Sequence, residues 1–575
     1  MFPLRQEDLL YSLRPAAQVR IAPPMDDRRA WTGFDPDASA ALVAQAEKAL
    51  RAPLPMLTAG DFLARTGAEA PAGYTLRRRS AMALVLGACV SGDEKYLPRA
   101  ADLIWLIAEE TNWATFPRRG ASLPAFGSPD MDLNAARTAE LFALSRQMVG
   151  ARLDRISPQL SSRMEYELRR RVFDPVIARD GEDWMHLGSD APRICAHLLA
   201  ACLAAETDEG ERRWQVIRRV MRLLEGTLRT LLPDGGAANG LERHMEAASA
   251  LNDCFSMISL ASGGVVELRD EPRFIEMAVL PCKTHVGEGW FVNPGGSPRP
   301  RLSPDALFRL GEGTRSGCLC GLAAWLRRRE SAFEPEFGGL FTAFAHLRGR
   351  EKLIREPARL SMPGSALMPD MGVALARAGD FFVALTDGIS PHLGAGDVSL
   401  YYRGEPVIAA AGLPGADAHS VPAVEGVEQT GARRAPEPPE VRYDGYFLIT
   451  AGIAHAYPPA AKLYSWQRSL MLLPGENLVR LIDAFDFEGA QSRATFRFIT
   501  PFEPRLFDGG ARLGPVVMRF PAGLAPSVTT IGLENPRLAE IWGGRVYRLE
   551  LTMPEPAPGG RLDFSFSPAD DIGLQ

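Results

Sequence analysis

The stretch Ser390–Gln429, SPHLGAGDVSLYYRGEPVIAAAGLPGADAHSVPAVEGVEQ, contains the most informative pattern in the chain. It holds two of the eight histidines, His392 and His419, in a region rich in glycine. The apolar and aromatic run that ends at Tyr402 predicts a strand, and the Gly-Glu-Pro triplet that begins at Gly404 predicts a tight turn after it. We therefore expect strands and turns to hold the two histidines on one sheet.

The sequence that follows the linker HLRGREKLIREPARLSMPG (residues 346–364) has a period of two. Segments such as VALARAGDFFVALTDG, GRVYRLELTMP and RLDFSFS alternate or are rich in β-branched and aromatic residues, and Gly and Pro turns separate them. The tetrapeptide PGEN at Pro474–Asn477 predicts a hairpin between two such segments. Many strands without intervening helices predict an antiparallel β-sandwich over residues 356–575.

The first part of the chain has a helical period instead. Segments with apolar residues three and four apart come in pairs joined by short turns, for example NAARTAELFALSRQMVG followed by SPQLSSRMEYELRRRVFDPVIA. Helical hairpins that recur about every 50 to 60 residues predict a curved array of paired helices over residues 1–355. Trp113 and Trp184 lie in longer loops, where they would stack on sugar rings or pack against a helix.

The composition is that of a large globular protein. The chain has 575 residues, of which 46% are hydrophobic and 23% charged, and this length predicts two large units. The net charge of −6 argues against a broad basic surface and against nucleic acid as a partner. No apolar run is long enough for a membrane span, and we expect a cytoplasmic protein, or a periplasmic one if a leader was removed. The seven cysteines form no CxxC pair, so we expect most of them to be buried thiols.

Motifs in both parts of the chain point to one family. In the first part they are DLNAARTAELFALSRQMVGARLDRISPQL, ELRRRVFDPVIARDGEDW and LLPDGGAANG, and in the second part MPDMGVALARAG, the Ser390–Gln429 stretch and YSWQRSLMLLPGENLVRLIDAF. In this order they resemble the heparinase II/III-like polysaccharide lyases. The resemblance implies an N-terminal (α/α) toroid of helical hairpins followed by a C-terminal antiparallel β-sandwich. It also implies a polysaccharide lyase whose partner is an acidic polysaccharide or oligosaccharide.

The Gly-Glu-Pro triplet aligns the Ser390–Gln429 stretch with the family signature. His392 then takes the position of a metal-binding histidine, and His419 takes that of a third histidine. Ser390 stands where the family has a catalytic histidine, and Ala410 where it has a metal-binding aspartate.

Zinc is the cofactor that this alignment implies, because neutral imidazoles on one sheet suit that ion. His392 and His419 supply only two ligands, and Asp417 or Asp397 would have to replace the missing carboxylate. The alternative is that no cofactor binds and that the two histidines form hydrogen bonds with loop carbonyls.

The lyase reaction that the resemblance implies needs three groups. One neutralises the C6 carboxylate of a uronate, a base removes the C5 proton, and an acid protonates the leaving oxygen. In the family the helical domain supplies an Asn, Glu or His and a Tyr soon after a PDGG-type turn. Here that turn is Pro233–Gly236, and Arg243 stands at or near the position of the Tyr. No tyrosine occurs between Tyr166 and Tyr401.

We predict catalytic and substrate-binding residues from these positions. The candidate catalytic residues are His244, His186 and His392, and the candidate substrate-binding residues are Arg243, Asn239, Trp184 and Tyr402. The ordinary pKa of an imidazole suits a general base, and an arginine binds a carboxylate through two hydrogen bonds. Tyr401 and Tyr402 point to opposite faces of their strand, so at most one of them faces a cleft. Each polar residue at a helix start has an alternative role as a cap or a surface pair.

Three functions remain open at this stage. The first is a lyase that cleaves a uronate-containing polysaccharide or oligosaccharide by β-elimination. The second is a catalytically inactive relative that binds a glycan or a partner in a cleft between the two domains. The third is a hydrolase or another glycan-modifying enzyme on the same scaffold that uses carboxylates such as Glu242 and Asp190, although Glu242 and Glu246 are expected to form a solvated face. The sequence leaves the oligomeric state open.

Overall fold

A computed structural model describes most of the chain and divides it into two compact units. The described residues are 12–64, 70–115, 123–124, 131–178, 190–205, 211–236, 240–293, 295–330, 332–388, 394–413, 415, 418–430, 437–489 and 491–569. Unit 1 consists of Met1–Thr230, Met245–Phe274 and Ser303–Leu360. Unit 2 consists of Leu231–His244, Ile275–Leu302 and Ser361–Gln575.

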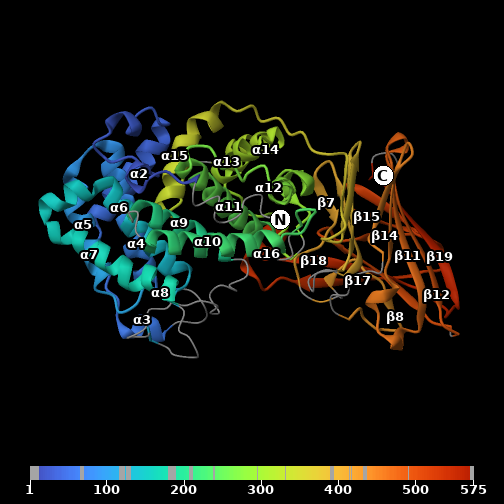
Figure 1. Ribbon diagram of the computed structural model, residues 1–575. Coiled ribbons are helices and arrows are strands. Elements are labelled where there is room, and N and C mark those ends of the chain that lie inside the picture. Colours follow the sequence, from blue (N-terminus) through green and yellow to red (C-terminus); the bar gives the residue numbers. More distant parts are fainter. Residues whose placement is uncertain are drawn as a thin grey trace. The chain divides into compact units, whose positions relative to one another are not determined.

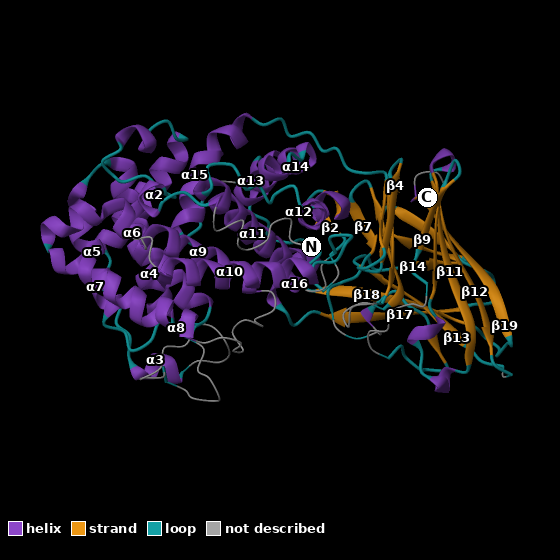
Figure 2. Ribbon diagram, viewed as in Figure 1, coloured by secondary structure: helices purple, strands orange, loops and turns teal. Residues whose placement is uncertain are grey.

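Unit 1 is built from helices (purple in Figure 2). They are α2 (Pro36–Arg51), α3 (Ala59–Leu63), α4 (Ala72–Ser91), α5 (Leu97–Ala108), α6 (Leu133–Ile156), α7 (Pro158–Leu168), α8 (Asp174–Ala178), α9 (Ala191–Ala205), α10 (Glu211–Thr230), α13 (Pro304–Thr314), α14 (Gly317–Arg327) and α15 (Leu340–Arg355). Helices α11 (Leu241–Ala261) and α12 (Pro272–Thr284) have residues in both units.

Helix α6 packs against five other helices of unit 1, namely α4, α5, α7, α9 and α15 (Figure 1). Asp132 caps its first turn by accepting a hydrogen bond of 2.8 Å from the Ala135 amide. The other oxygen of the same carboxylate accepts a hydrogen bond of 2.8 Å from the Thr115 amide. Small side chains on α6 let its neighbours approach closely; the buried ones include Ala135, Ala136, Ala139 and Ala143.

Unit 2 contains the strands that follow the helices (orange in Figure 2), and they pair antiparallel in three sheets. The eight-stranded sheet has the order β14 (Arg505–Phe507), β15 (Gly510–Leu513), β16 (Val516–Arg519), β19 (Gly559–Pro568), β12 (Leu478–Phe487), β11 (Leu463–Leu473), β10 (Phe447–Gly452) and β9 (Glu440–Tyr443). The five-stranded sheet runs β3 (Ser365–Met368), β4 (Val373–Ala378), β5 (Phe381–Asp387), β6 (Ala395–Tyr402) and β7 (Glu405–Ile408). The four-stranded sheet runs β17 (Ala525–Gly532), β18 (Arg545–Thr552), β13 (Ala494–Thr500) and β8 (Ala423–Val424).

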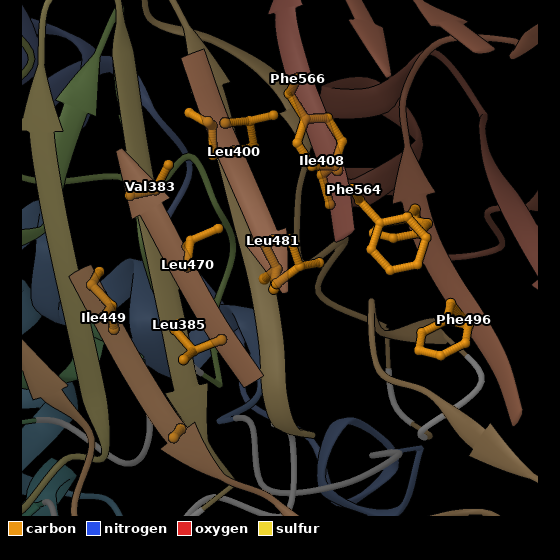
Figure 3. Packing of buried hydrophobic residues seen from close by; sticks show 14 of the residues in the cluster. Val383, Leu385, Leu400, Ile408, Ile449, Leu470, Leu481, Phe496, Phe564 and Phe566 are labelled. Carbon is orange, nitrogen blue, oxygen red and sulfur yellow. The ribbon is translucent and has the colours of Figure 1, made fainter. Parts of the chain in front are cut away.

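The sheets of unit 2 enclose one continuous apolar core, part of which Figure 3 shows. Val383 and Leu400 of the five-stranded sheet belong to the same buried cluster as Leu470 and Leu481 of the eight-stranded sheet and Phe496 of β13. Apolar side chains that face inward from both sheets make this a β-sandwich.

A buried ion pair lies within the sandwich. The Arg468 guanidinium on β11 binds the Asp483 carboxylate on β12 through two hydrogen bonds of 2.8 and 3.0 Å, and neither side chain is exposed. Arg468 also donates to the carbonyls of Gly396 and Ser420, both at 2.8 Å. The Trp466 indole donates to Asp483 at 2.7 Å. These bonds join two strands of one sheet to the start of β6 and to the loop before β8.

The fold class predicted from the sequence is confirmed, with helices first and antiparallel sheets after them. The PGEN hairpin is also confirmed, because Leu473 of β11 pairs with Leu478 of β12. Two elements do not follow the order of helices in the first part of the chain and strands in the second. A small hairpin of β1 (His285–Gly287) and β2 (Trp290–Phe291) lies between helices in the sequence, and α16 (Pro536–Trp542) lies between strands.

Other expectations can be compared with single residues. None of the seven cysteines, all of which are described, forms a disulfide bond, and five of them are buried. Trp113 is fully buried, and its indole donates to the Ile107 carbonyl at 3.0 Å, so this tryptophan packs against helices and does not present a sugar-stacking surface. No helix within the described ranges is long and apolar enough to cross a membrane.

The Arg468–Asp483 pair gives a test of what stabilises the sandwich. Arg468→Met leaves the Asp483 carboxylate buried without its cation, and we expect the free energy of unfolding to fall by about 3–5 kcal/mol. The double variant Arg468→Met, Asp483→Leu removes both charges and should lose less than the single variant. Urea unfolding followed by tryptophan fluorescence measures both. Equal losses in the two variants would contradict this account of the pair.

Candidate active site

A cavity of about 260 Å³ lies within unit 2. Its wall is formed by three segments: the residues after β2, the strands β5 and β6, and the loop that follows β7. Strand β6 contributes Asp397, Ser399 and Tyr401, which share one face because side chains alternate along a strand. Val398 and Leu400, on the opposite face, belong to the apolar core. The cavity therefore lies against the outer face of the strand whose inner face builds the sandwich.

A β-bulge sets which residues of β6 face the cavity. Leu385 of β5 pairs with Val398, but Asp387 pairs with Ala395, so β6 carries one residue more than its partner. Gly396 stands at this point with a φ of 79°, a left-handed conformation that favours glycine.

His419 and Asp397 form a buried pair in the cavity wall. The Nδ1 atom of His419 lies 2.8 Å from Oδ2 of Asp397, and Oδ1 of the same carboxylate accepts a hydrogen bond of 2.8 Å from the Ser420 amide. The side chains are only 3% and 2% exposed. A carboxylate in this position fixes the orientation of the imidazole ring.

The two adjacent tyrosines of β6 have different surroundings. Tyr401 lines the cavity, and its hydroxyl makes no hydrogen bond within the part of the chain that the structure describes. Burial and the nearby Asp397 carboxylate raise the pKa of Tyr401 well above its ordinary value, so the phenol is protonated at neutral pH. Tyr402 belongs to the core, where its ring packs against Phe381 at a centroid distance of 5.0 Å. The predicted substrate-binding role of Tyr402 does not agree with this position, because strand alternation presents Tyr401 to the cavity instead.

The first turn of α11 is attached to the cavity wall. The Leu241 amide donates a hydrogen bond of 2.7 Å to the side-chain oxygen of Asn293, which lines the cavity. A Cβ atom on Gly240 would lie 3.0 Å from the Cα atom of Gly296, another residue of the wall. Arg243 is exposed on this turn, and no hydrogen bond or ion pair joins it to any described residue. Sequence analysis missed Asn293, although its NPGG turn marks a loop with special backbone geometry.

Glu242, one residue earlier, is engaged in an ion pair. Arg537 binds its carboxylate, with one Nη1 to Oε2 distance of 3.0 Å, and the Arg301 amide donates to it. Burial would raise the pKa of Glu242, but the Arg537 pair outweighs it and holds the pKa below the usual range. Glu246 pairs with Arg193 at 3.1 Å. Glu246 is exposed, as expected for a solvated face, whereas Glu242 is half-buried in its ion pair and is poorly suited to act as an acid in hydrolysis.

His244 is partly buried and points toward a backbone carbonyl. Its Nε2 atom lies 3.3 Å from the Met277 carbonyl oxygen on α12. Burial lowers the pKa of His244 from an ordinary value of 6.5 to about 4, although contacts with the Met277 and Gly235 backbone oppose the change. A neutral imidazole with so low a pKa is a weak base. These contacts favour a structural role, and catalysis by His244 stays a prediction.

Four predicted site residues lie outside the described residues: His186, Trp184, Asn239 and His392. Their proposed roles stay predictions.

The described side chains of the cavity wall do not by themselves form a zinc site. Among the described residues of the cavity wall, His419 and Asp397 are the two side chains of the types that zinc prefers, and Ala410 offers no donor. Across the described ranges, no group of three or more His, Cys, Asp or Glu side chains could hold a metal ion. Zinc takes four ligands, so the remaining ones would have to come from His392 or Asp417, which lie outside the described residues.

Comparison with known proteins identifies the fold. No family model matches the sequence, and no curated protein matches it. Among solved structures the likeness extends over nearly the whole chain, and the structures concerned are those of polysaccharide lyases.

Individual lyases show how far the likeness goes. Heparinase III is 12% identical, with a TM-score of 0.63 over 97% of this chain and 88% of its own. The Streptomyces coelicolor A3 chondroitin AC lyase, solved in complex with chondroitin sulphate, is 13% identical, with a TM-score of 0.56 over 94% of this chain and 82% of its own. The heparan sulfate lyase HepC from Pedobacter heparinus is 12% identical, with a TM-score of 0.53 over 98% and 87%. The chain thus has the fold of these lyases.

The pKa of His244 predicts a pH-dependent stability. Because the folded imidazole resists protonation, its stabilising effect is complete above pH 6.5 and is lost as the pH falls toward 4. The loss is on the order of 3 kcal/mol, since one pKa unit corresponds to about 1.4 kcal/mol. His244→Gln should flatten this part of the curve, which melting temperatures at pH 7, 5.5 and 4.5 measure. An unchanged curve, together with a loss of enzymatic rate, would return His244 to a catalytic role.

The zinc interpretation can be tested by restoring the missing carboxylate. We expect the natural protein to hold less than one zinc ion per chain and its melting temperature to be nearly unchanged by a chelator. Ala410→Asp adds a donor beside His419 and should increase the zinc content, whereas the uncharged control Ala410→Asn should not. Elemental analysis measures the content. One zinc ion per natural chain would show that residues such as His392 or Asp417 already complete a site.

Proposed function

We propose that the protein is a polysaccharide lyase-like enzyme that cleaves a uronate-containing polysaccharide or oligosaccharide by β-elimination. The lyase fold supports the general class. The observation that carries the chemistry is the cavity of unit 2, in which a histidine oriented by a carboxylate lies in the same wall as a protonated tyrosine.

Elimination transfers one proton to a base and one from an acid. The base removes the C5 proton, the electron pair forms the C4–C5 double bond, and the C4–O bond breaks as the leaving oxygen takes a proton. In this proposal His419 is the base, because Asp397 would stabilise the imidazolium that forms. Tyr401 is the acid, because its phenol is protonated and lies in the same cavity wall as His419, where it could donate to the developing alkoxide.

The carboxylate of the uronate needs a cation or strong donor as the C5 proton leaves. Arg243 is the residue we assign to this role, because it is exposed on the turn of α11 that binds Asn293 in the cavity wall. Its guanidinium is suited to bind a carboxylate through two parallel hydrogen bonds.

A second candidate is a protein that binds an acidic glycan without cleaving it. Two observations favour it: no tyrosine occurs between Tyr166 and Tyr401, and Ala410 stands in the cavity wall without a donor. The two candidates differ in whether a double bond forms.

The double bond makes the proposal testable without knowledge of the sugar. An unsaturated uronate absorbs ultraviolet light, whereas bound or hydrolysed glycan does not, so a panel of uronate glycans separates a lyase from a hydrolase or a binding protein. Tyr401→Phe should lower the rate by about 100-fold or more, as loss of a general acid does. His419→Ala should have an effect of similar size.

Tyr402→Phe is the matched control, because Tyr402 is the neighbour whose side chain faces the core. We expect its rate to stay within about threefold of the natural enzyme. A large loss in Tyr402→Phe with none in Tyr401→Phe would reverse the assignment of the two tyrosines. Binding of glycans with no change in absorbance for any of them would favour the inactive binding protein.

A further inference from the structure

Arg137, on the second turn of α6 in unit 1, is a partly buried arginine that forms no hydrogen bond or ion pair with any described residue. Its Nε atom is buried and makes no hydrogen bond. No hydrogen bond, ion pair or ring contact joins its guanidinium to any residue within the ranges that the structure describes. Other buried arginines of this unit are paired, such as Arg350 with Asp305 at 2.5 Å.

An unpaired cation in such a place destabilises the fold. Burial removes water from the guanidinium, and buried charges in proteins are normally compensated by a partner. Burial, with a contribution from the nearby positive charge of Arg193, lowers the pKa of Arg137. A charged residue that destabilises the fold and forms no ion pair is typical of a binding site.

The nearest carboxylate on the same helix is already committed. Glu140, one turn further along α6, binds the Nδ1 atom of His197 with one oxygen and accepts a hydrogen bond of 2.7 Å from the Phe341 amide with the other. Gly339 permits this approach, because a Cβ atom there would lie 2.6 Å from a Glu140 oxygen. Glu140 therefore has no oxygen directed to Arg137 in a hydrogen bond.

The adjacent helix adds a second arginine and engages the remaining acids. Helix α9 packs against α6 and carries Arg193 near its start. Arg193 binds Asp190 at 3.0 Å and Glu246 at 3.1 Å. All three carboxylates near Arg137 thus have other partners, and the Arg137 guanidinium keeps its donors for a ligand.

We propose that Arg137 binds an anionic group of an acidic oligosaccharide, a carboxylate or a sulfate ester, in a subsite of the helical unit. Two parallel hydrogen bonds from a planar guanidinium match the oxygens of either group. The ligand would accept the hydrogen bonds that no described residue accepts from the Arg137 guanidinium. The proposal rests on the proposed function for the class of ligand.

Binding and stability of Arg137→Gln test the proposal together. Calorimetry is carried out with a uronate oligosaccharide, a sulfated uronate oligosaccharide, a neutral oligosaccharide of equal length and inorganic sulfate. We expect at least one acidic oligosaccharide to bind the natural protein and to bind Arg137→Gln about 10-fold or more weakly, which is the effect of losing a charge-assisted hydrogen bond. Whichever acidic oligosaccharide loses more affinity identifies the group that Arg137 binds. The melting temperature of the free variant should be equal to or higher than that of the natural protein, because no internal partner is lost.

Two further variants make the result specific. Arg155→Gln is the control, because Arg155 lies on the same helix, is 65% exposed and approaches only Glu94, at 3.8 Å. Its affinities should be unchanged. Arg137→Lys keeps the charge but not the planar pair of donors, so it should recover part of the affinity.

The outcomes separate this proposal from the proposed function. Unchanged binding in Arg137→Gln, a lowered melting temperature, or equal loss in Arg155→Gln would overturn the subsite. Inorganic sulfate that binds as tightly as the oligosaccharides would also overturn it, since the site would then be one for a small free anion. Arg137-dependent binding without any ultraviolet absorbance would support the subsite while the lyase proposal fails. Elimination by Arg137→Gln at an unchanged rate and KM would support the lyase proposal and overturn the subsite.

Discussion

The guanidinium of Arg468 has no access to water, and the candidate active site depends on how its hydrogen bonds are satisfied. It binds Asp483 and the carbonyls of Gly396 and Ser420. Those two carbonyls belong to the residues next to Asp397 and His419. A buried cation requires all of its acceptors, so the strand and the loop that carry the histidine and the carboxylate are held in place from within the core. The orientation of the pair is thus a property of the sandwich as much as of the cavity.

Unit 1 places charge in its interior in a comparable way. Asp253 binds Arg309 at 2.5 Å and accepts a hydrogen bond of 2.7 Å from Thr342, and Glu140 joins α6, α9 and the start of α15. Such networks favour one arrangement of helices over its alternatives more than they add to stability. Helices fixed in this way provide a rigid support for Arg137, and a rigid support reduces the entropy lost when a ligand binds.

The sequence predicted the architecture better than it predicted the site. Periodicity and turn residues were sufficient for helical hairpins, antiparallel strands and the PGEN hairpin, because these patterns are local. The side of β6 that faces the cavity depends on the bulge at Gly396, which the sequence does not reveal, and Tyr402 was chosen where the structure presents Tyr401. The partner of Glu242 is Arg537, which lies far along the chain, so no local pattern could predict the ion pair. Arg137 escaped notice for a related reason: the absence of a partner is visible only once all neighbours are placed.

The bulge at Gly396 also has a consequence for how this strand can evolve. A one-residue insertion or deletion between Val398 and Tyr402 would exchange the two faces of β6, bringing core side chains into the cavity and polar ones into the sandwich. Length changes on the other side of Gly396, before Ala395, leave that alternation untouched. We therefore expect relatives of this protein to vary in length ahead of the bulge and to diverge after it by substitution alone, with any gap there spanning two residues.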